Sequence, residues 1–550
     1  MSDVAGEASG DARDLDLGVV EDADAGAIDD VAADVSMSDE APRPIAPLST
    51  STVTSLRPTL RWALPPGITR ARVELCRDRA CTTVVATLEG TDRATVTSDL
   101  SAGWMFWRVS SLRGATVSSG PSATWQFYVG PRGTTVDRSY GSVLDVNGDG
   151  LRDVAIAAPQ RMVGLVRNAG SALVYYGARS GLPATESWRF DGASSDESVG
   201  LFVADAGDVN GDGFSDLAVS ARDGANAHRG LVRIFHGGPT GLSAMPATSI
   251  PGVNSNDLFG FTSSAVGDLN GDGYGDFAVH TLSAGTMSQG AVSFYLGSAT
   301  GLRLPAVAVF LGAQPRERFG MTVAAAGDIN GDGYSDVVIG REGASSSFDY
   351  VPVYFGREAG ISPTPALTLR VPVPELRLGV ALCAGDFNGD GFSDVVVGSP
   401  AQRRLLIHYG DGATLPPSAT TPISVSMLAG AVGSVLSSFG DMNGDGFDDF
   451  ASASNTNSVV AATWFGNALP SPLAGPVVMP REGVSSLGGR GDTDGDGRAE
   501  LLAGSPNALV AGMSTGMAFL YRGTTLGLDL AAPRSFSGVT PLERFGEALH

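Results

Sequence analysis

The sequence predicts an all-β protein in which most of the chain is a repeat array. A nine-residue segment, DINGDGYSD from Asp328 to Asp336, returns in six near-copies at spacings of about fifty to sixty residues. Glycine is abundant, at 74 of 550 residues, which suits many tight turns between short strands. No segment shows the 3.6-residue apolar period over ten or more residues that a helical solenoid would need.

Each repeat contains short apolar runs in the same order. In the fourth repeat, RFGMTVAAAG leads into the Asp-rich segment, VVIG follows it directly, and YVPVYFG precedes a glycine-containing turn. Weaker runs such as PALTLRV can form outer strands. Four short strands per period of about fifty-eight residues, repeated seven times, predict a seven-bladed β-propeller over residues 133–550.

Residues 46–130 predict a separate small β-sandwich. Short β-rich runs alternate with turn residues there, and Val73 and Leu75 fall on one face of their strand. The segment also holds four of the six tryptophans of the chain, which we expect to form one core: Trp62, Trp104, Trp107 and Trp125. An exposed aromatic platform for carbohydrate is the alternative interpretation.

Residues 1–45 predict a disordered acidic tether. They contain thirteen acidic residues against Arg13 and Arg43 and no aromatic residue, so they cannot bury enough apolar surface to offset chain entropy. Such a segment repels itself and extends. A stalk that holds the folded part away from a surface and a plain solvated tail both remain open.

The net charge of -23 belongs to this tether and to the repeated segments. The tether carries -11 and the remaining residues carry -12, which one divalent cation per repeat would bring to about +2. We therefore expect no nucleic-acid partner, since no basic stripe interleaved with aromatic residues is present. No run approaches twenty apolar residues and no signal peptide is visible, so either the protein is cytosolic or its secretion signal lies outside this chain.

The three cysteines fall into two groups. Cys76 and Cys81 are close enough in sequence to be bridged across a turn, which would indicate an oxidising compartment, although two free thiols remain the alternative. Cys383 follows an apolar run, and we interpret it as a buried thiol that packs like a small hydrophobic side chain.

The repeated Asp-rich segments predict cation loops. Oxygen-bearing side chains stand at positions one, three, five and nine of each loop, and the backbone carbonyl at position seven can join them, which is the donor set that Ca²⁺ requires. Glycines at positions four and six let the backbone curl. Two other metals are less favoured, because Mg²⁺ prefers a smaller octahedral shell and Zn²⁺ prefers Cys or His ligands. Turns without a metal are also disfavoured, because three carboxylates in one loop would repel each other. We therefore expect up to seven Ca²⁺ ions, one per loop.

The predicted ligands share these five positions in every loop. In chain order they are Asp145, Asn147, Asp149, Leu151 and Asp153; Asp208, Asn210, Asp212, Phe214 and Asp216; Asp268, Asn270, Asp272, Tyr274 and Asp276; Asp328, Asn330, Asp332, Tyr334 and Asp336; Asp386, Asn388, Asp390, Phe392 and Asp394; Asp441, Asn443, Asp445, Phe447 and Asp449; and Asp492, Asp494, Asp496, Arg498 and Glu500.

These residues carry a family resemblance. Phe319-Gly320 and Phe259-Gly260 place an FG pair before the loop, and Gly398-Ser399-Pro400 loosely supplies a Gly-Ala-Pro element after it. The units resemble FG-GAP repeats, the calcium-loop blades of integrin α-subunit propellers and of many bacterial surface proteins. The resemblance covers about 410 residues and implies a seven-bladed propeller whose loops join the two inner strands of each blade and bind Ca²⁺. Separately, the Pro-x-Leu-x-Trp pattern of residues 58–62 resembles a fibronectin type III or immunoglobulin-like module.

The first and last repeats depart from the pattern. In the seventh loop Asp494 and Glu500 replace the usual Asn and Asp, so its coordination is expected to be looser or altered. The first unit is short, and the chain ends in an eighth FG pair, Phe545-Gly546, that reaches no loop. We expect this terminal strand to complete the first blade and to close the ring. A chain truncated inside an eighth blade is the alternative.

The sequence favours a non-enzymatic function. The five histidines are scattered without metal-ligand spacing, and no nucleophile elbow, P-loop or dinucleotide fingerprint occurs in a suitable context. We expect a monomeric, extracytoplasmic, calcium-stabilised scaffold for adhesion or for binding an unknown protein or glycan. A propeller-type polysaccharide lyase or hydrolase and a glycan-binding lectin are the alternatives. The tripeptide Arg490-Gly491-Asp492 is interpreted as a chance product of the loop sequence.

Overall fold

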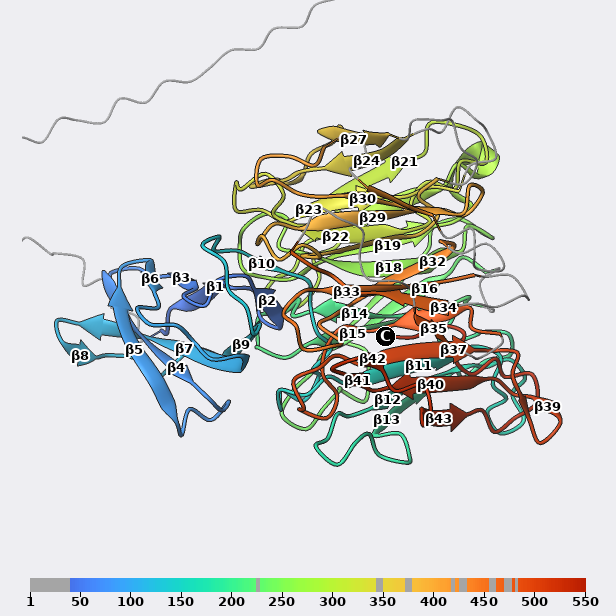
Figure 1. The fold of residues 1–550 in the computed structure, drawn as a ribbon, viewed down its shortest axis with the longest axis horizontal. Coiled ribbons are helices and arrows are strands. Elements are labelled where there is room, and N and C mark those ends of the chain that lie inside the picture. Colours follow the sequence, from blue (N-terminus) through green and yellow to red (C-terminus); the bar gives the residue numbers. More distant parts are fainter. Residues whose placement is uncertain are drawn as a thin grey trace, which may run out of the picture. The chain divides into compact units, whose positions relative to one another are not determined.

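The computed structural model describes residues 40–223, 228–342, 350–370, 378–416, 421–424, 433–454, 461–468, 477–479 and 483–550. Most of the predicted acidic tether, residues 1–39, lies outside the described residues. Figure 1 shows an architecture built almost entirely of strands, which confirms the all-β prediction. A short π-helical turn, η2 (Ala284–Ser288), is an exception. No helix in the described part of the chain has the length and apolar character needed to cross a membrane.

The first ten strands form the N-terminal module, by which we mean residues 40–140. In chain order they are β1 (Arg43–Ala46), β2 (Ser51–Val53), β3 (Thr59–Ala63), β4 (Arg70–Cys76), β5 (Val84–Gly90), β6 (Arg93–Thr95), β7 (Gly103–Arg113), β8 (Thr116–Val117), β9 (Trp125–Val129) and β10 (Ser139–Tyr140). One sheet has the order β1-β3-β6, and the other has the order β10-β2-β9-β7-β4-β5, with β8 paired to β7. Strand β1 therefore begins inside the segment predicted as tether, and β10 extends the module beyond residue 130.

The two sheets of the module share one apolar core. Val73 and Leu75 are fully buried on one face of β4, as their alternation predicts. Trp62, Trp107 and Trp125 lie in this core. Trp104 differs from the prediction, because it packs edge-on against Tyr128 and lies beside a second small cluster that contains both bridged cysteines. Three of the four tryptophans are therefore core residues.

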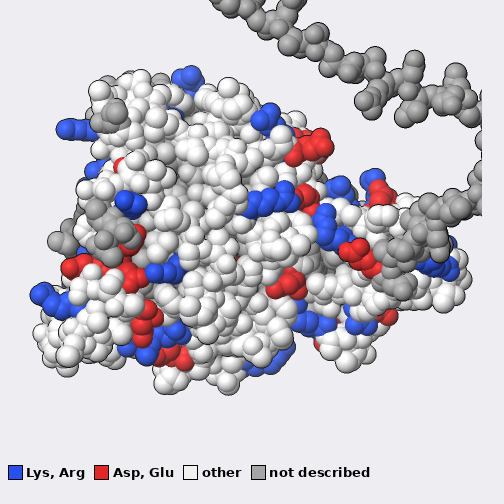
Figure 2. Space-filling model, turned by 180° about the vertical axis from the view of Figure 1, so that it is seen from behind, with Lys and Arg blue, Asp and Glu red and all other residues white. Residues whose placement is uncertain are grey.

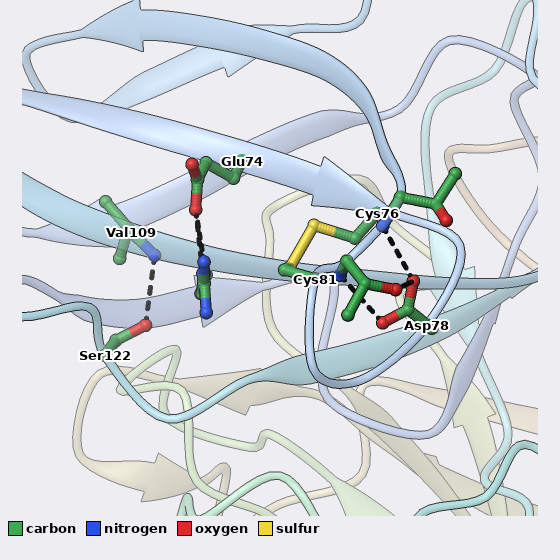
Figure 3. The surroundings of a disulfide bond; sticks show 9 residues. Glu74, Cys76, Asp78, Cys81, Val109 and Ser122 are labelled. Atoms are coloured by element: carbon green, nitrogen blue, oxygen red, sulfur yellow. Dashed lines mark hydrogen bonds and ion pairs between the residues drawn. A yellow bond between two sulfur atoms is a disulfide. The ribbon is translucent and has the colours of Figure 1, made fainter.

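A disulfide joins Cys76 at the end of β4 to Cys81 (Figure 3). It closes a turn in which the Asp78 carboxylate accepts hydrogen bonds from the backbone N–H groups of Thr82 and Thr83, both at 2.9 Å. The bridge and these bonds fix the conformation of residues 76–83. Cys383, on a later strand, is a buried free thiol whose pKa is raised by burial, in agreement with its interpretation as a packing residue.

The rest of the chain forms seven small antiparallel sheets in sequence order. They are β11 (Val154–Ala158), β12 (Ser171–Tyr175) and β13 (Trp188–Asp191); β14 (Val203–Gly207), β15 (Asp216–Ala221), β16 (Leu231–Phe235) and β17 (Thr248–Pro251); β18 (Phe259–Gly267), β19 (Asp276–Thr281), β20 (Ala291–Tyr295) and β21 (Ala308–Leu311); β22 (Val323–Gly327), β23 (Asp336–Ile339), β24 (Tyr350–Tyr354) and β27 (Leu367–Arg370); β28 (Leu382–Gly385), β29 (Asp394–Ser399), β30 (Arg404–His408) and β31 (Thr421–Ser424); β32 (Val435–Gly440), β33 (Asp449–Ala453), β34 (Ala461–Trp464) and β35 (Val477–Met479); and β36 (Ser486–Gly488), β37 (Leu501–Ser505), β40 (Met517–Tyr521) and β43 (Arg534–Ser537).

Within each sheet, every strand pairs antiparallel with the next. Three two-stranded hairpins project from these sheets: β25 (Gly356–Arg357) with β26 (Gly360–Ile361), β38 (Leu509–Val510) with β39 (Met513–Ser514), and β41 (Gly523–Thr524) with β42 (Gly527–Leu528). In the second sheet, for example, β15 is wholly buried and the outermost strand β17 is only partly buried.

Buried apolar clusters join each sheet to the next. Six clusters connect consecutive sheets, from the first with the second to the sixth with the seventh. A further cluster joins the seventh sheet to the first, because Leu502 and Leu520 pack with Val154 and Ile156. The sheets therefore pack in a cyclic order, with no sheet left without a neighbour on either side.

The last residues of the chain pair with the first sheet. Leu549 bridges Ile156 in antiparallel register, and the N–H groups of Ala155 and Ala157 donate to the carbonyl oxygens of His550 and Ala548 at 2.7 and 3.0 Å. The first sheet has only three strands of its own. The C-terminal residues thus provide the partner that its inner edge would otherwise lack.

Candidate cation loops and the module that contacts them

Six of the seven Asp-rich loops connect the first and second strands of a sheet, with the position-nine acid at or next to the start of the second strand. The second loop, for example, joins β14 to β15, and Asp216 at position nine is the first residue of β15. The first loop instead follows β10 and leads into β11. This placement agrees with the order of runs read from the sequence.

Within the second loop, the side chains at positions one, three and five turn toward the same backbone segment. Asp208 accepts hydrogen bonds from the N–H groups of Asp212 at 3.0 Å and Gly213 at 2.7 Å. Asn210 accepts from the N–H of Asp212 at 3.1 Å and donates to its carboxylate at 2.8 Å. Gly213 has φ = +93°, a left-handed conformation that favours glycine. The same bonds recur in the first and the third to sixth loops.

The acid at position nine ties its loop to two other parts of the sheet. Asp216 accepts from the N–H of Val209 at position two and from that of Gly237 beyond β16, at 3.0 and 2.9 Å. Equivalent pairs of bonds form at the other five aspartates at position nine. Each carboxylate oxygen keeps a second lone pair that can face a cation.

Burial makes these carboxylates unfavourable as free anions. The pKa of Asp208 is raised to about 8, first because it is buried and second because the Asp212 carboxylate lies nearby. Burial likewise raises the pKa of Asp268 to about 7 and that of Asp145 to about 6. A divalent cation at the loop would favour the ionised form of each acid. The donor set therefore fits a hard cation better than it fits empty turns.

The seventh loop brings four carboxylates together. One oxygen each from Asp492, Asp494, Asp496 and Glu500 lies within 4.8 Å of the others. Glu500 is fully buried, and its Oε1 has no hydrogen-bond partner among the described residues, whereas Oε2 accepts from the N–H of Thr493. An unpartnered buried carboxylate oxygen beside three acids is the arrangement that a cation would satisfy. Arg522 pairs with Asp494 at the edge of this group.

Backbone hydrogen bonds link neighbouring loops. In six of the seven neighbouring pairs, the N–H at position eight of one loop donates to the carbonyl at position one of the preceding loop, and among the described residues the fourth and fifth loops lack this bond. The pairs are Ser215 to Asp145 at 3.0 Å, Gly275 to Asp208 at 2.8 Å, Ser335 to Asp268 at 2.8 Å, Asp448 to Asp386 at 3.1 Å, Ala499 to Asp441 at 2.8 Å and Arg152 to Asp492 at 2.8 Å. The last pair connects the first loop to the seventh. The loops therefore lie next to one another in a cyclic series.

Four arginines of the N-terminal module reach the loops, and sequence reasoning did not identify them. Arg79 donates to the carbonyl oxygens of Gly148 in the first loop and Gly213 in the second, at 2.8 and 2.7 Å. The other three contacts involve Arg43 with the Asp272 carbonyl, Arg132 with the Asp445 carbonyl at 2.7 Å, and Arg138 with the carbonyl and carboxylate of Asp328 at 2.7 and 2.8 Å. No recognisable sequence motif surrounds these arginines, so their contacts with the loops could be identified only in the structure.

The aromatic side chains at position seven receive the same arginines. The guanidinium carbon of Arg79 lies 4.1 Å from the ring centroid of Phe214, and that of Arg132 lies 4.3 Å from that of Phe447. Two longer contacts complete the set, Arg43 over Tyr274 at 4.9 Å and Arg138 over Phe392 at 5.5 Å. Cation–π attraction therefore adds to the carbonyl contacts. The sequence did not indicate what these position-seven side chains contact.

Arg490 belongs to the interior of this region. Its guanidinium pairs with the Asp448 carboxylate at 2.6 Å and lies over the ring of Tyr140. Asp492 accepts from the N–H groups of Gly495 and Gly497 within its own loop. Both charged side chains of the Arg-Gly-Asp tripeptide are therefore engaged inside the protein.

Charged residues elsewhere are mixed. On the face that Figure 2 shows, basic and acidic side chains are interspersed rather than gathered into one large patch of a single sign.

Comparison with known families supports the resemblance seen in the sequence. Residues 141–175, 203–235 and 319–356 match the FG-GAP repeat, and residues 386–464 match an FG-GAP-like repeat. The matched segments include five of the seven loops, namely the first, second, fourth, fifth and sixth.

The chain is also similar to integrin α subunits over about a quarter of its length. Identity is 33% over 144 residues with integrin alpha-6 of Gallus gallus, which covers 26% of this chain and 13% of the integrin. It is 34% over 146 residues with integrin alpha-5 of Xenopus laevis, which covers 25% and 14%. The chain therefore matches only a small part of the length of these relatives.

A solved structure was also compared. A proposed 6-phosphogluconolactonase from Bacteroides fragilis covers 72% of this chain and 97% of its own, at 10% identity and a TM-score of 0.45. At that TM-score the likeness supports no conclusion about fold or activity.

Proposed function

We propose that the protein is a calcium-stabilised, seven-bladed FG-GAP propeller that acts as a non-enzymatic, extracytoplasmic scaffold for adhesion or binding. The observation that carries this proposal is the series of Asp-rich loops, in which backbone hydrogen bonds link six of the seven neighbouring pairs, including the seventh loop with the first. The seven sheets would be the blades, and the C-terminal residues would complete the first one. The N-terminal module would be a fibronectin III-like or immunoglobulin-like sandwich.

Calcium is the cation that the loops fit best. Each of the first six loops offers three carboxylates, an amide oxygen and a backbone carbonyl, and the seventh offers four carboxylates. Oxygen donors in this number suit the larger and more flexible coordination shell of Ca²⁺. Bound calcium would supply positive charge among the buried acids and hold the turns closed.

An extracytoplasmic location is supported by the Cys76–Cys81 disulfide, which is typical of an oxidising compartment. We propose a protein or glycan ligand held by the connections between blades, with a monomeric scaffold, and the similarity to integrin α subunits supports an adhesive role.

Thermal unfolding with and without a chelator tests the calcium proposal. Because a ligand that binds only the folded state stabilises by mass action, free calcium at a hundred times the dissociation constant contributes about 2.7 kcal/mol per site. We expect EDTA to lower the melting temperature markedly and excess calcium to restore it. The variant D212N should weaken the calcium response, whereas D99N, which alters only an exposed ion pair with Arg57, should not. A melting temperature that EDTA leaves unchanged would refute the proposal.

A further inference from the structure

The arginine contacts between the N-terminal module and the loops leave most of the predicted ligand carboxylates without an arginine partner, although Gln126 of the module donates to the Asp145 carboxylate at 2.8 Å. Arg43, Arg79 and Arg132 donate to backbone carbonyl oxygens at positions four, five or six, not to the carboxylates at positions one, three, five and nine. Arg138 also pairs with the Asp328 carboxylate. A guanidinium and a cation can therefore occupy one loop at the same time.

The charge of the loops favours binding of a cation and an arginine side chain to the same loop. The second to fifth loops each hold three carboxylates and no basic side chain, so a bound divalent cation leaves a net charge of about -1 on the loop, whereas the first loop also contains Arg152 and the sixth also contains Asp448. One guanidinium balances that remaining charge. Because arginine donates from a rigid planar fork, it also needs its acceptor carbonyls in fixed positions, and a curled loop provides them.

We propose that cation binding by the loops and docking of the N-terminal module are thermodynamically coupled, so that each strengthens the other. This inference rests on the proposed loading of the loops with calcium. The coupling acts through the arginines that contact both the carbonyl oxygens and the position-seven rings. By linkage, a docked module raises the calcium affinity of the loops by the same factor by which calcium strengthens docking.

Arg79 is the centre of this coupling. It lies inside the turn that the Cys76–Cys81 disulfide closes (Figure 3), and its position is held further by the Asp78 hydrogen bonds. Its guanidinium contacts two consecutive loops and also donates to the Thr124 carbonyl of the module at 2.9 Å. A single preorganised side chain thus connects the module with two cation loops.

The close approach of the module to the loops is also evident at glycines of the loops, where an added Cβ would overlap atoms of the module. An added Cβ at Gly213 would lie 2.2 Å from the Thr124 carbonyl oxygen, and one at Gly446 would lie 2.4 Å from Arg132. At Gly497 of the seventh loop nothing lies within 4 Å. Glycine at position six therefore admits the module at the second and sixth loops.

Calcium titration of full-length variants tests the proposal. R79Q removes the contacts and the charge, and R79K keeps the charge but cannot reach both carbonyl oxygens with one ammonium group. R108K is the matched control, because Arg108 pairs with Glu74 inside the module. We expect R79Q and R79K to lower the calcium affinity of the coupled sites by about fivefold or more and R108K to leave it unchanged, as measured by calorimetry on proteins with native circular dichroism.

The sign of the R79Q effect separates coupling from simple repulsion. If Arg79 only repelled the cation, its removal would raise calcium affinity, and that result would overturn the proposal, as would an unchanged affinity. Hydrogen exchange supplies a second readout, in which EDTA should raise amide exchange in residues 76–83 of the wild-type protein. Equal protection with and without calcium would also overturn it. If the wild-type protein binds no calcium, the proposed function itself fails, and this outcome is distinct from binding without coupling.

Discussion

Replacing Gly213 by alanine should disturb the protein more than the equivalent change in the seventh loop. Gly213 and Gly497 both occupy position six, with φ of +93° and +86°, so alanine in this left-handed region costs about 1–2 kcal/mol at either site. Only at Gly213 would the new Cβ also overlap a backbone carbonyl, that of Thr124 at 2.2 Å. Overpacking of this kind adds about 1–3 kcal/mol.

Calcium-loaded G213A and G497A are therefore compared by thermal unfolding and by hydrogen exchange. G213A should have the lower melting temperature, and residues 124–129 of the module should lose protection, because withdrawal of the module relieves the overlap. G497A should show only the smaller effect of backbone strain. Equal melting temperatures, with unchanged protection at residues 124–129 in both variants, would refute the close approach of module and loop.

Two further predictions concern the chain terminus and protons. Deleting Phe545–His550 removes the backbone bonds to β11 and the buried Phe545 and Leu549, so the melting temperature should fall, and an unchanged melt would contradict completion of the first sheet. Burial raises the pKa of Asp208 from 3.8 to about 8, so without a cation the Asp208 carboxyl stays protonated in the folded state between about pH 4 and pH 8, where the unfolded chain has lost that proton. The free energy of unfolding of the cation-free protein should therefore fall as the pH rises from about 4 through 8. Calcium binding at pH 7 should accordingly release protons, measured by calorimetry in buffers of different ionisation enthalpy, and zero release would contradict the burial of these acids.

The repeated part of the fold could be predicted because its information is local. The Asp-rich loop, its flanking apolar runs and its glycines lie within one repeat, so strand order and loop placement follow from a single unit, as β14, β15 and Asp216 show. The same holds for the alternation of Val73 and Leu75 in β4. The terminal pairing of Leu549 with Ile156 was foreseeable because Phe545-Gly546 begins an unfinished copy.

The contacts between the module and the loops could not be predicted in this way. Arg79 and Gly213 are 134 residues apart, and although Gly213 belongs to the repeated loop, no pattern marks Arg79 as its partner. Trp104 was assigned to the core by composition alone, although its neighbours place it at a different cluster. The coordination of the seventh loop was expected to be looser or altered because Asp494 and Glu500 depart from the pattern, and this stays a prediction. The structure adds that the four acids of this loop converge within 4.8 Å, which the sequence spacing did not show.

The number of calcium ions bound per chain tests the central claim most directly. Native mass spectrometry of the full chain, dialysed against calcium and then against EDTA, measures this number without a functional assay. The loops predict up to seven calcium ions per chain, removed by EDTA and reduced by one in D212N, which alters only the second loop. A chain that binds no calcium under these conditions would contradict the account.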